Sequence, residues 1–172
     1  MKELILGGAR SGKSALAQHR AEQSGLKVTY IATASALDAE MAERIARHRR
    51  ARPGHWDLVE ELLAVAGTLQ ANAAHDHCLL VDCLTLWLTN LLVAGDDRLA
   101  REKQTLLELL PTLPGHIILV SNEVGQGIVP ANEFARRFRD EAGWLHQDLV
   151  RLCDRVTFTI AGLPLTLKDI TL

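Results

Sequence analysis

Residues 4–14 of the chain read Leu-Ile-Leu-Gly-Gly-Ala-Arg-Ser-Gly-Lys-Ser. A short apolar run, typical of a buried strand, leads directly into Gly7-x-x-x-x-Gly12-Lys13-Ser14, which is the P-loop pattern. In a P-loop, the backbone N–H groups of a glycine-rich turn and the positive end of the following helix surround phosphate oxygens. The run 14–23 is compatible with that helix, so the motif stands between a strand and a helix, as its mechanism requires. The sequence therefore predicts a site for a nucleoside triphosphate.

The polar side chains of this motif have expected roles. Lys13 is expected to reach the outer phosphates, and the Ser14 hydroxyl is expected to ligate Mg²⁺. Asp82 ends the apolar, strand-like run 78–82, where an acidic side chain can serve the same metal ion. Many strands end in Asp only because a loop begins there, but the presence of a P-loop favours the metal role. The predicted phosphate and metal site consists of Gly7, Gly8, Ala9, Arg10, Ser11, Gly12, Lys13, Ser14 and Asp82.

Composition predicts a single soluble globular domain that spans residues 1–172. The chain is 48% hydrophobic and 23% charged, and it is long enough to form a core without disulfides or a structural metal. Its net charge of −2 and its few aromatic residues (three Trp, three Phe and one Tyr) argue against a nucleic-acid partner. No apolar run suits a membrane span or a signal peptide. Three cysteines without metal-ligand spacing indicate reduced core residues, and we expect a cytoplasmic protein.

Strand-like and helix-like segments alternate along the chain, which predicts an α/β fold with a mostly parallel sheet and helices on both faces. Ligands of such sheets bind at the carboxyl ends of the strands, so we expect the site residues there. Strands are predicted at 3–6, 28–32, 78–82, 117–121 and 155–161, with a further short one at 165–167. Helices are predicted at 14–23, 38–50, 61–72, 84–93, 98–110 and 132–153.

The segment 38–53 is the most unusual part of the sequence. Met41, Ile45 and His48 are four and three residues apart, so a helix would place His48 on one face with apolar neighbours. The surrounding arginines are Arg44, Arg47, Arg49, Arg50 and Arg52. In one interpretation, His48 is a packed side chain on a solvated basic helix. In the other, the arginines bind anions and keep the imidazole neutral and nucleophilic, because nearby positive charge disfavours the imidazolium.

A second polar segment, Asn122-Glu-Val-Gly-Gln-Gly127, directly follows the strand-like run 117–121. Its two glycines suit a loop that approaches a ligand or a neighbouring loop closely. In that case Glu123 is a candidate base or a residue near the metal. Asn122 and Glu123 can equally cap the next element, and the sequence leaves both interpretations open.

Five segments, in order along nearly the whole chain, resemble the bifunctional adenosylcobinamide kinase/adenosylcobinamide-phosphate guanylyltransferase family. The P-loop is generic, whereas the segments that contain His48 and Asn122 are far more specific. The five segments are Gly-Gly-Ala-Arg-Ser-Gly-Lys-Ser at 7–14, Tyr-Ile-Ala-Thr at 30–33, Asp-x-Glu-Met-x-x-Arg-Ile-x-x-His at 38–48, Arg-Pro-x-His-Trp at 52–56 and Asn-Glu-Val-Gly-x-Gly-Ile-Val-Pro at 122–130.

The resemblance implies a P-loop fold, a homotrimer and two reactions of adenosylcobalamin biosynthesis. The first phosphorylates the aminopropanol hydroxyl of adenosylcobinamide with ATP or GTP, and the second transfers GMP from GTP to that phosphate. The resemblance also implies that His48 accepts the GMP as a phosphoramidate and that the P-loop, with Mg²⁺, holds the nucleotide phosphates. The further GTP-contacting positions that it implies are Thr33, Ala34, Ser35, Arg49, Arg50, Ala51, Arg52, Glu60 and Asp82.

Two alternatives are weighed against this function. A single-activity P-loop kinase for another small alcohol would transfer only the γ-phosphate, and His48 would be structural. A nucleotide-binding regulatory module would hydrolyse its nucleotide slowly and present a surface to a partner. A covalent guanylyl adduct that depends on His48 distinguishes the bifunctional enzyme from both.

Overall fold

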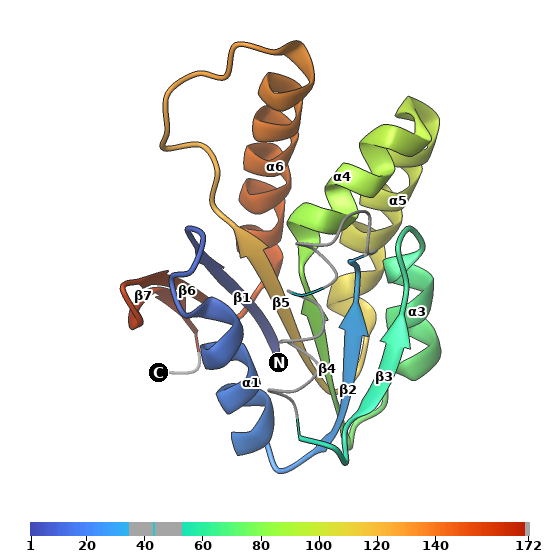
Figure 1. The fold of residues 1–172 in the computed structure, drawn as a ribbon. Coiled ribbons are helices and arrows are strands. Elements are labelled where there is room, and N and C mark those ends of the chain that lie inside the picture. Colours follow the sequence, from blue (N-terminus) through green and yellow to red (C-terminus); the bar gives the residue numbers. More distant parts are fainter. Residues whose placement is uncertain (35–42, 44–52, 171–172) are drawn as a thin grey trace.

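The computed structural model describes residues 1–34, 43 and 53–170, and its centre is a seven-stranded sheet in the order β3-β2-β4-β5-β1-β6-β7 (Figure 1). The strands are β1 (Lys2–Gly7), β2 (Lys27–Ala32), β3 (Asp57–Glu60), β4 (His77–Asp82), β5 (His116–Asn122), β6 (Arg155–Ile160) and β7 (Leu163–Asp169). The helices are α1 (Lys13–Gln23), α3 (Val65–Asn72), α4 (Leu84–Ala94), α5 (Asp96–Leu109), the short 3₁₀ helix η1 (Leu110–Thr112) and α6 (Glu133–Leu152).

The sheet is parallel from β3 to β6, and only β7 runs antiparallel, paired with β6. The predicted α/β class with a mostly parallel sheet is therefore confirmed. β1 and β5 lie in the interior of the sheet, and all residues of β1 are buried. This burial explains why both strands are apolar runs without alternation, since helices cover both of their faces. The parallel register also brings the carboxyl ends of β1 to β6 to one edge of the sheet.

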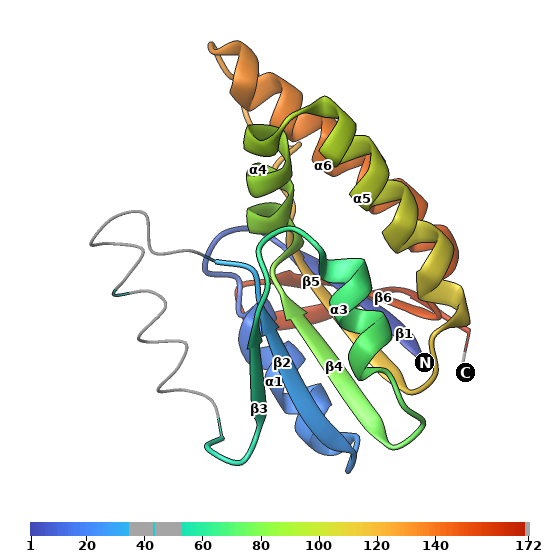
Figure 2. The same ribbon diagram turned by 90° about the vertical axis from the view of Figure 1, so that its right-hand side faces the viewer.

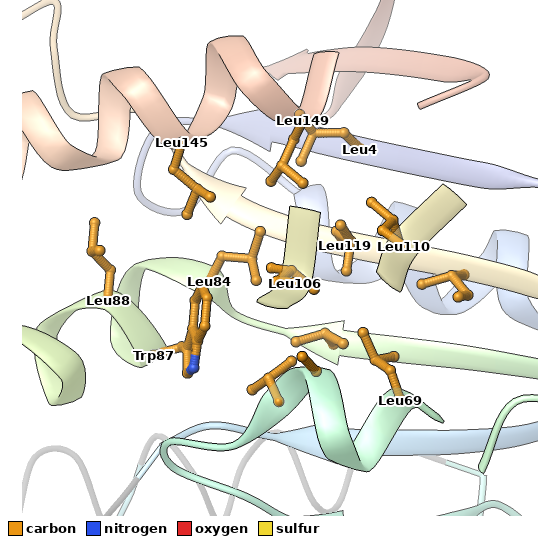
Figure 3. Packing of buried hydrophobic residues seen from close by; sticks show 14 of the residues in the cluster. Leu4, Leu69, Leu84, Trp87, Leu88, Leu106, Leu110, Leu119, Leu145 and Leu149 are labelled. Carbon is orange, nitrogen blue, oxygen red and sulfur yellow. The ribbon is translucent and has the colours of Figure 1, made fainter. Parts of the chain in front are cut away.

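The two faces of the sheet carry separate cores, and the helices divide between them (Figures 1 and 2). On one face, Ala17 and Ala21 of α1 pack against Ile5, Leu80 and Ile118. On the other face α3, α4, α5 and α6 enclose the larger core, in which Leu4, Leu119, Trp87, Leu106 and Leu149 meet (Figure 3). Trp87 is fully buried there. Small residues on α1 let that helix lie close to the sheet, which positions the P-loop that precedes it.

The structure differs from the sequence-based assignment at two elements. β3 was not predicted, because it is a four-residue edge strand whose ends are the charged residues Asp57 and Glu60. The helix expected at 61–72 begins only at Val65. Glu61 accounts for this later start, because its Oε1 accepts the N–H groups of Leu63 and Ala64 at 2.7 and 2.8 Å. Most of the helix expected at 38–50 lies outside the described residues.

The three cysteines are buried and unpaired with one another, as the composition predicts. Burial raises the pKa of Cys78 to about 11 and that of Cys153 to about 12, so both remain neutral thiols at physiological pH. Among the described residues, no helix combines the length and the apolar character that crossing a membrane requires.

Candidate functional site: a P-loop at the carboxyl edge of the sheet

The segment between β1 and α1 has the backbone geometry of a phosphate-binding turn. Gly12 takes a positive φ of 95° and Arg10 a positive φ of 55°, so the chain reverses sharply before Lys13 begins α1. The first N–H groups of a helix have no acceptor within the helix, and the first turn of α1 contains no acidic side chain that would repel an anion. This end of α1 can therefore receive phosphate oxygens, as the sequence predicts.

Two glycines of the loop stand where a larger residue would not fit. A Cβ atom added to Gly7 would lie 2.6 Å from Ser11 Oγ and 2.6 Å from the carbonyl oxygen of Thr159. A Cβ atom added to Gly12 would lie 3.1 Å from Gly162 Cα. Gly162, in the turn between β6 and β7, also donates its N–H to the Ser11 carbonyl at 2.8 Å. The β6–β7 turn thus supports the P-loop from outside.

Lys13 is folded against the loop that precedes it. Its side chain is buried, and its Nζ donates a hydrogen bond to the Gly8 carbonyl at 2.9 Å. Ser14 follows in the first turn of α1 and is half-buried. Ser11 is buried, and its Oγ has no hydrogen-bond partner among the described residues. Ser11, Lys13 and Ser14 thus lie within four consecutive residues at the start of α1, where the phosphate groups of a nucleotide are expected.

Asp82 ends β4 at the same edge of the sheet. One strand, β5, separates β4 from β1, so the ends of these two strands are about 10 Å apart. The Tyr30 hydroxyl donates to Asp82 Oδ2 at 3.1 Å, and Tyr30 itself is buried. The pKa of the Cys83 thiol is raised, mainly by burial. The charge of Asp82 raises this pKa further, whereas the charge of Lys13 lowers it. Asp82 and Lys13 therefore both lie near Cys83 at this edge of the sheet.

Thr33, Ala34 and Glu60 lie further along this edge. The registers place Glu60 beside Ala32, and Ala32 beside Asp82, so β3, β2 and β4 end side by side. Thr33 is fully buried; its hydroxyl donates to the Cys83 carbonyl at 2.7 Å and accepts the Cys83 N–H at 2.9 Å. Glu60 is exposed at the end of the edge strand. The remaining predicted site residues, which lie outside the described part of the chain, are Ser35, His48, Arg49, Arg50, Ala51 and Arg52.

The polar segment after β5 contacts the P-loop through its backbone. The Glu123 N–H donates to the Gly7 carbonyl at 3.0 Å, which brings this segment close to the phosphate site. Glu123 Oε1 accepts the N–H of Gly125 at 2.7 Å, so the carboxylate also shapes its own loop. Asn122 Nδ2 donates to Thr85 Oγ1 of α4 at 2.8 Å. The close approach to a neighbouring loop is thus present, whereas the next helix, α6, is capped by Asn132 and not by Asn122 or Glu123.

Sequence reasoning did not identify three contributors to this edge. Tyr30 is hidden in an apolar strand, although a lone tyrosine in such a strand signals a hydroxyl in need of a partner. Gly162 contacts the P-loop from a distant turn that carries no motif. Asn90 of α4 donates its side-chain amide to the carbonyls of Thr33 and Leu62. The signal for this contact in the sequence is the polar side chain of Asn90 within the largely apolar α4, because a polar group in such a run needs a hydrogen-bond partner.

Known proteins are similar to this chain in sequence and in fold. Residues 3–167 match the family described as cobinamide kinase / cobinamide phosphate guanyltransferase. The bifunctional adenosylcobalamin biosynthesis protein CobP of Pseudomonas aeruginosa is 62% identical over 169 residues, which cover 98% of each chain. The bifunctional adenosylcobalamin biosynthesis protein CobU of Salmonella typhimurium is 39% identical over 182 residues, which cover 98% of this chain and all of that protein.

Among solved structures, the flagellar accessory protein FlaH of Methanocaldococcus jannaschii superimposes with a TM-score of 0.51. The match covers 98% of this chain and 78% of that one at 15% identity, and it therefore bears on the fold alone. The family match extends over nearly the whole chain and includes the P-loop, the carboxyl ends of the strands and the segment after β5. This chain belongs to the cobinamide kinase / cobinamide phosphate guanyltransferase family.

Proposed function

We propose that this chain is a bifunctional transferase that phosphorylates adenosylcobinamide and then transfers GMP from GTP to the product, giving adenosylcobinamide-GDP and pyrophosphate. The observation that supports the proposal is a P-loop with Lys13 folded onto it, in a chain that matches this family over residues 3–167. Asp82 ends β4 at the same edge of the sheet. The alternatives of a single-activity kinase and a regulatory module have no comparable support.

In the phosphorylation step, the aminopropanol hydroxyl of adenosylcobinamide attacks the γ-phosphorus of ATP or GTP. The bond to the leaving nucleoside diphosphate breaks, and the hydroxyl proton passes to a nearby base or to water. The N–H groups at the start of α1 and the ammonium group of Lys13 offset the negative charge that grows on the transferred and leaving oxygens. Lys13 Nζ donates to the Gly8 carbonyl at 2.9 Å, so its ammonium group lies against the loop that would receive the phosphates.

In the guanylylation step, a nitrogen of the neutral His48 imidazole attacks the α-phosphorus of GTP, and pyrophosphate leaves. The phosphate of adenosylcobinamide phosphate then attacks the phosphoramidate and restores the free imidazole. Arg49, Arg50 and Arg52 follow His48 within four residues and would offset the charge on the phosphates. Thr33, Ala34, Ser35, Ala51 and Glu60 complete the proposed GTP contacts.

Mg²⁺ is the proposed cofactor, with the Ser14 hydroxyl and the Asp82 carboxylate as the protein groups that would hold it. Their chemistry fits, because Mg²⁺ prefers oxygen ligands, and Tyr30 restrains the carboxylate at 3.1 Å. When bound with a nucleotide, the ion supplies charge that neutralises the phosphate oxygens.

The guanylyl adduct provides the test. Incubation with GTP labelled at the α-phosphorus is expected to label the protein in an acid-labile, alkali-stable form. His48→Ala is expected to abolish this label, whereas His75→Ala, an exposed histidine between α3 and β4, is expected to retain it. An unlabelled wild-type protein that still phosphorylates adenosylcobinamide would leave only the kinase half of the proposal.

We further propose that the chain acts in the cytoplasm as a homotrimer. The exposed apolar side chains of β7 support self-association: Leu163, Leu165 and Leu167 are 72%, 54% and 57% exposed on the outermost strand. Light scattering is expected to give three times the chain mass, and Leu165→Lys is expected to reduce it. A monomer at micromolar concentration would contradict the trimer.

A further inference from the structure

We propose that Glu123 is the general base of the phosphorylation step, the group that accepts the proton of the attacking hydroxyl. The inference deepens the proposed function and rests on it. Glu123 directly follows β5, which lies between β1, the strand that leads into the P-loop, and β4, which ends in Asp82 (Figure 1).

Of the carboxylates that the described residues place at this edge, that of Glu123 follows the strand nearest the P-loop strand. β5 and β1 are hydrogen-bonded neighbours, and their register pairs Asn122 with Gly7, the first residue of the P-loop. Strands of a sheet lie about 4.8 Å apart, so the end of β5 is one such spacing from β1, whereas Asp82 is two spacings away and Glu60 four. A carboxylate that acts at the transferred phosphoryl group is therefore best supplied by the end of β5.

The backbone of Glu123 and the ammonium group of Lys13 contact consecutive carbonyls of the P-loop. The Glu123 N–H donates to the Gly7 carbonyl at 3.0 Å, and Lys13 Nζ donates to the Gly8 carbonyl at 2.9 Å. Lys13 is the group that is expected to reach the outer phosphates. Glu123 therefore leaves the sheet beside the place where the transferred phosphate is expected.

The Glu123 carboxylate is half-buried and has one oxygen available for a proton. Oε1 accepts the N–H of Gly125 at 2.7 Å, whereas Oε2 has no hydrogen-bond partner among the residues that the structure describes. Asp82, in contrast, accepts the Tyr30 hydroxyl and is the proposed ligand of Mg²⁺. A carboxylate that holds the ion directs its lone pairs at the metal, so the metal ligand and the base are different residues.

The two residues before Glu123 fix the end of β5 against two helices. Ser121 is buried, and its Oγ lies 2.8 Å from Nε2 of the buried His146 on α6. Asn122 Nδ2 donates to Thr85 Oγ1 of α4 at 2.8 Å. Because a base must come within hydrogen-bond distance of the proton that it removes, these contacts give Glu123 a fixed starting point.

In this step the substrate hydroxyl oxygen attacks the γ-phosphorus while Glu123 Oε2 takes the hydroxyl proton. The bond from the γ-phosphorus to the bridging oxygen breaks, and the nucleoside diphosphate leaves with that electron pair. The neutral carboxyl group then returns its proton to water. Binding of the nucleotide itself needs no proton acceptor, so loss of Glu123 should lower turnover and leave nucleotide affinity unchanged.

Two substitutions of Glu123 and one control distinguish a base from a residue that only shapes its loop. Glu123→Gln keeps the length and an oxygen for the Gly125 N–H but removes the base, whereas Glu123→Asp keeps a carboxylate that is one methylene group shorter. The control is Glu133→Gln, since Glu133 is an exposed glutamate at the start of α6. Each protein is assayed for steady-state phosphorylation of adenosylcobinamide by ATP and for the dissociation constant of ADP, with its thermal unfolding recorded.

We expect Glu123→Gln to lower kcat about a hundredfold, the effect of losing a general base, while the dissociation constant of ADP changes by less than about twofold. Glu123→Asp should retain at least about ten times the rate of Glu123→Gln, because it still offers a carboxylate. Glu133→Gln should match the wild type in both measurements.

A residue that only shapes its loop would give the reverse order, with Glu123→Gln as active as the wild type and the shorter Glu123→Asp less active. That order, or equal rates for the two variants, would overturn the proposal, as would a loss of ADP affinity as large as the loss of kcat. A wild-type protein that does not phosphorylate adenosylcobinamide shows instead that the proposed kinase activity is wrong, and the role of Glu123 falls with it.

Discussion

The two halves of the carboxyl edge of the sheet are held in different ways. In the P-loop half, Lys13 reaches a carbonyl only five residues away, and the glycine-rich turn and the start of α1 form one continuous segment. In the half formed by β2, β3 and α4, Asn90 reaches carbonyls 57 and 28 residues away. The first half therefore carries part of its own geometry, with support from the backbone of Gly162 and Glu123, whereas the second depends on correct docking of α4. A substitution should act on one half without the other.

The largest expected effect is on the P-loop half and comes from loss of the positive charge of Lys13. Lys13→Ala removes the ammonium group that offsets charge on the transferred phosphate, so the rate of phosphorylation should fall roughly a hundred- to a thousandfold. Steady-state kinetics with adenosylcobinamide measure this loss. The control is Lys27→Ala, because the Lys27 side chain is 60% exposed and pairs only at the surface with Asp57, at 2.9 Å. A Lys13→Ala enzyme with nearly normal turnover would contradict the assigned role.

The next effect tests how tightly the P-loop half is built. Gly7→Ala places a Cβ atom 2.6 Å from both Ser11 Oγ and the Thr159 carbonyl oxygen, so the loop must shift. We expect a loss of about 1–3 kcal/mol in the free energy of unfolding, together with weaker nucleotide binding. Gly8→Ala is the stability control, since a Cβ atom there meets nothing within 4 Å. Denaturant unfolding of the two variants gives the comparison, and equal stability would show that the loop has room to adjust.

The same difference between the halves explains how much could be predicted from the sequence. The P-loop, Asp82 and most strands follow from local patterns, because a motif, an apolar run and a strand end are each written in adjacent residues. The contacts of Tyr30 with Asp82 and of Asn90 with Thr33 join residues 52 and 57 positions apart, and no local pattern encodes such a pairing. The short edge strand β3 was missed because its pairing with β2 decides its conformation more than its composition does.

A smaller effect is expected where the two halves meet, at Tyr30 and Asp82. Tyr30→Phe removes the hydroxyl that donates to Asp82 Oδ2 at 3.1 Å, so the carboxylate loses one restraint. The Mg²⁺ concentration for half-maximal phosphorylation should rise about five- to tenfold, which corresponds to about 1–1.4 kcal/mol for one hydrogen bond. A metal titration of both proteins measures the shift. An unchanged titration midpoint would show that Tyr30 contributes only to the core.

The smallest effect is expected at the opposite, amino edge of the sheet, where a buried polar cluster should influence stability alone. His116 begins β5 and is buried, with its Nε2 3.7 Å from a carboxylate oxygen of Glu3. Glu3 is fully buried and also forms an ion pair with Arg20. Burial lowers the pKa of His116 from 6.5 to about 4, and the positive charges of the N-terminus, Arg155, Lys2 and Arg20 add to this shift.

Between pH 6.5 and 4 the unfolded chain therefore holds a proton on His116 that the folded chain does not. Because the unfolded state then binds more protons, the free energy of unfolding should decrease as the pH falls through this range. Above pH 6.5, His116 should no longer lower the free energy of unfolding. His116→Gln should reduce the slope but not remove it, since burial also lowers the pKa of His146. Unfolding curves at several pH values measure the slope, while labelling by GTP and phosphorylation at pH 7.5 should match the wild type. An identical slope in the variant would mean that His116 does not titrate in this way, and a loss of either activity would mean that the amino edge affects the site at the carboxyl edge.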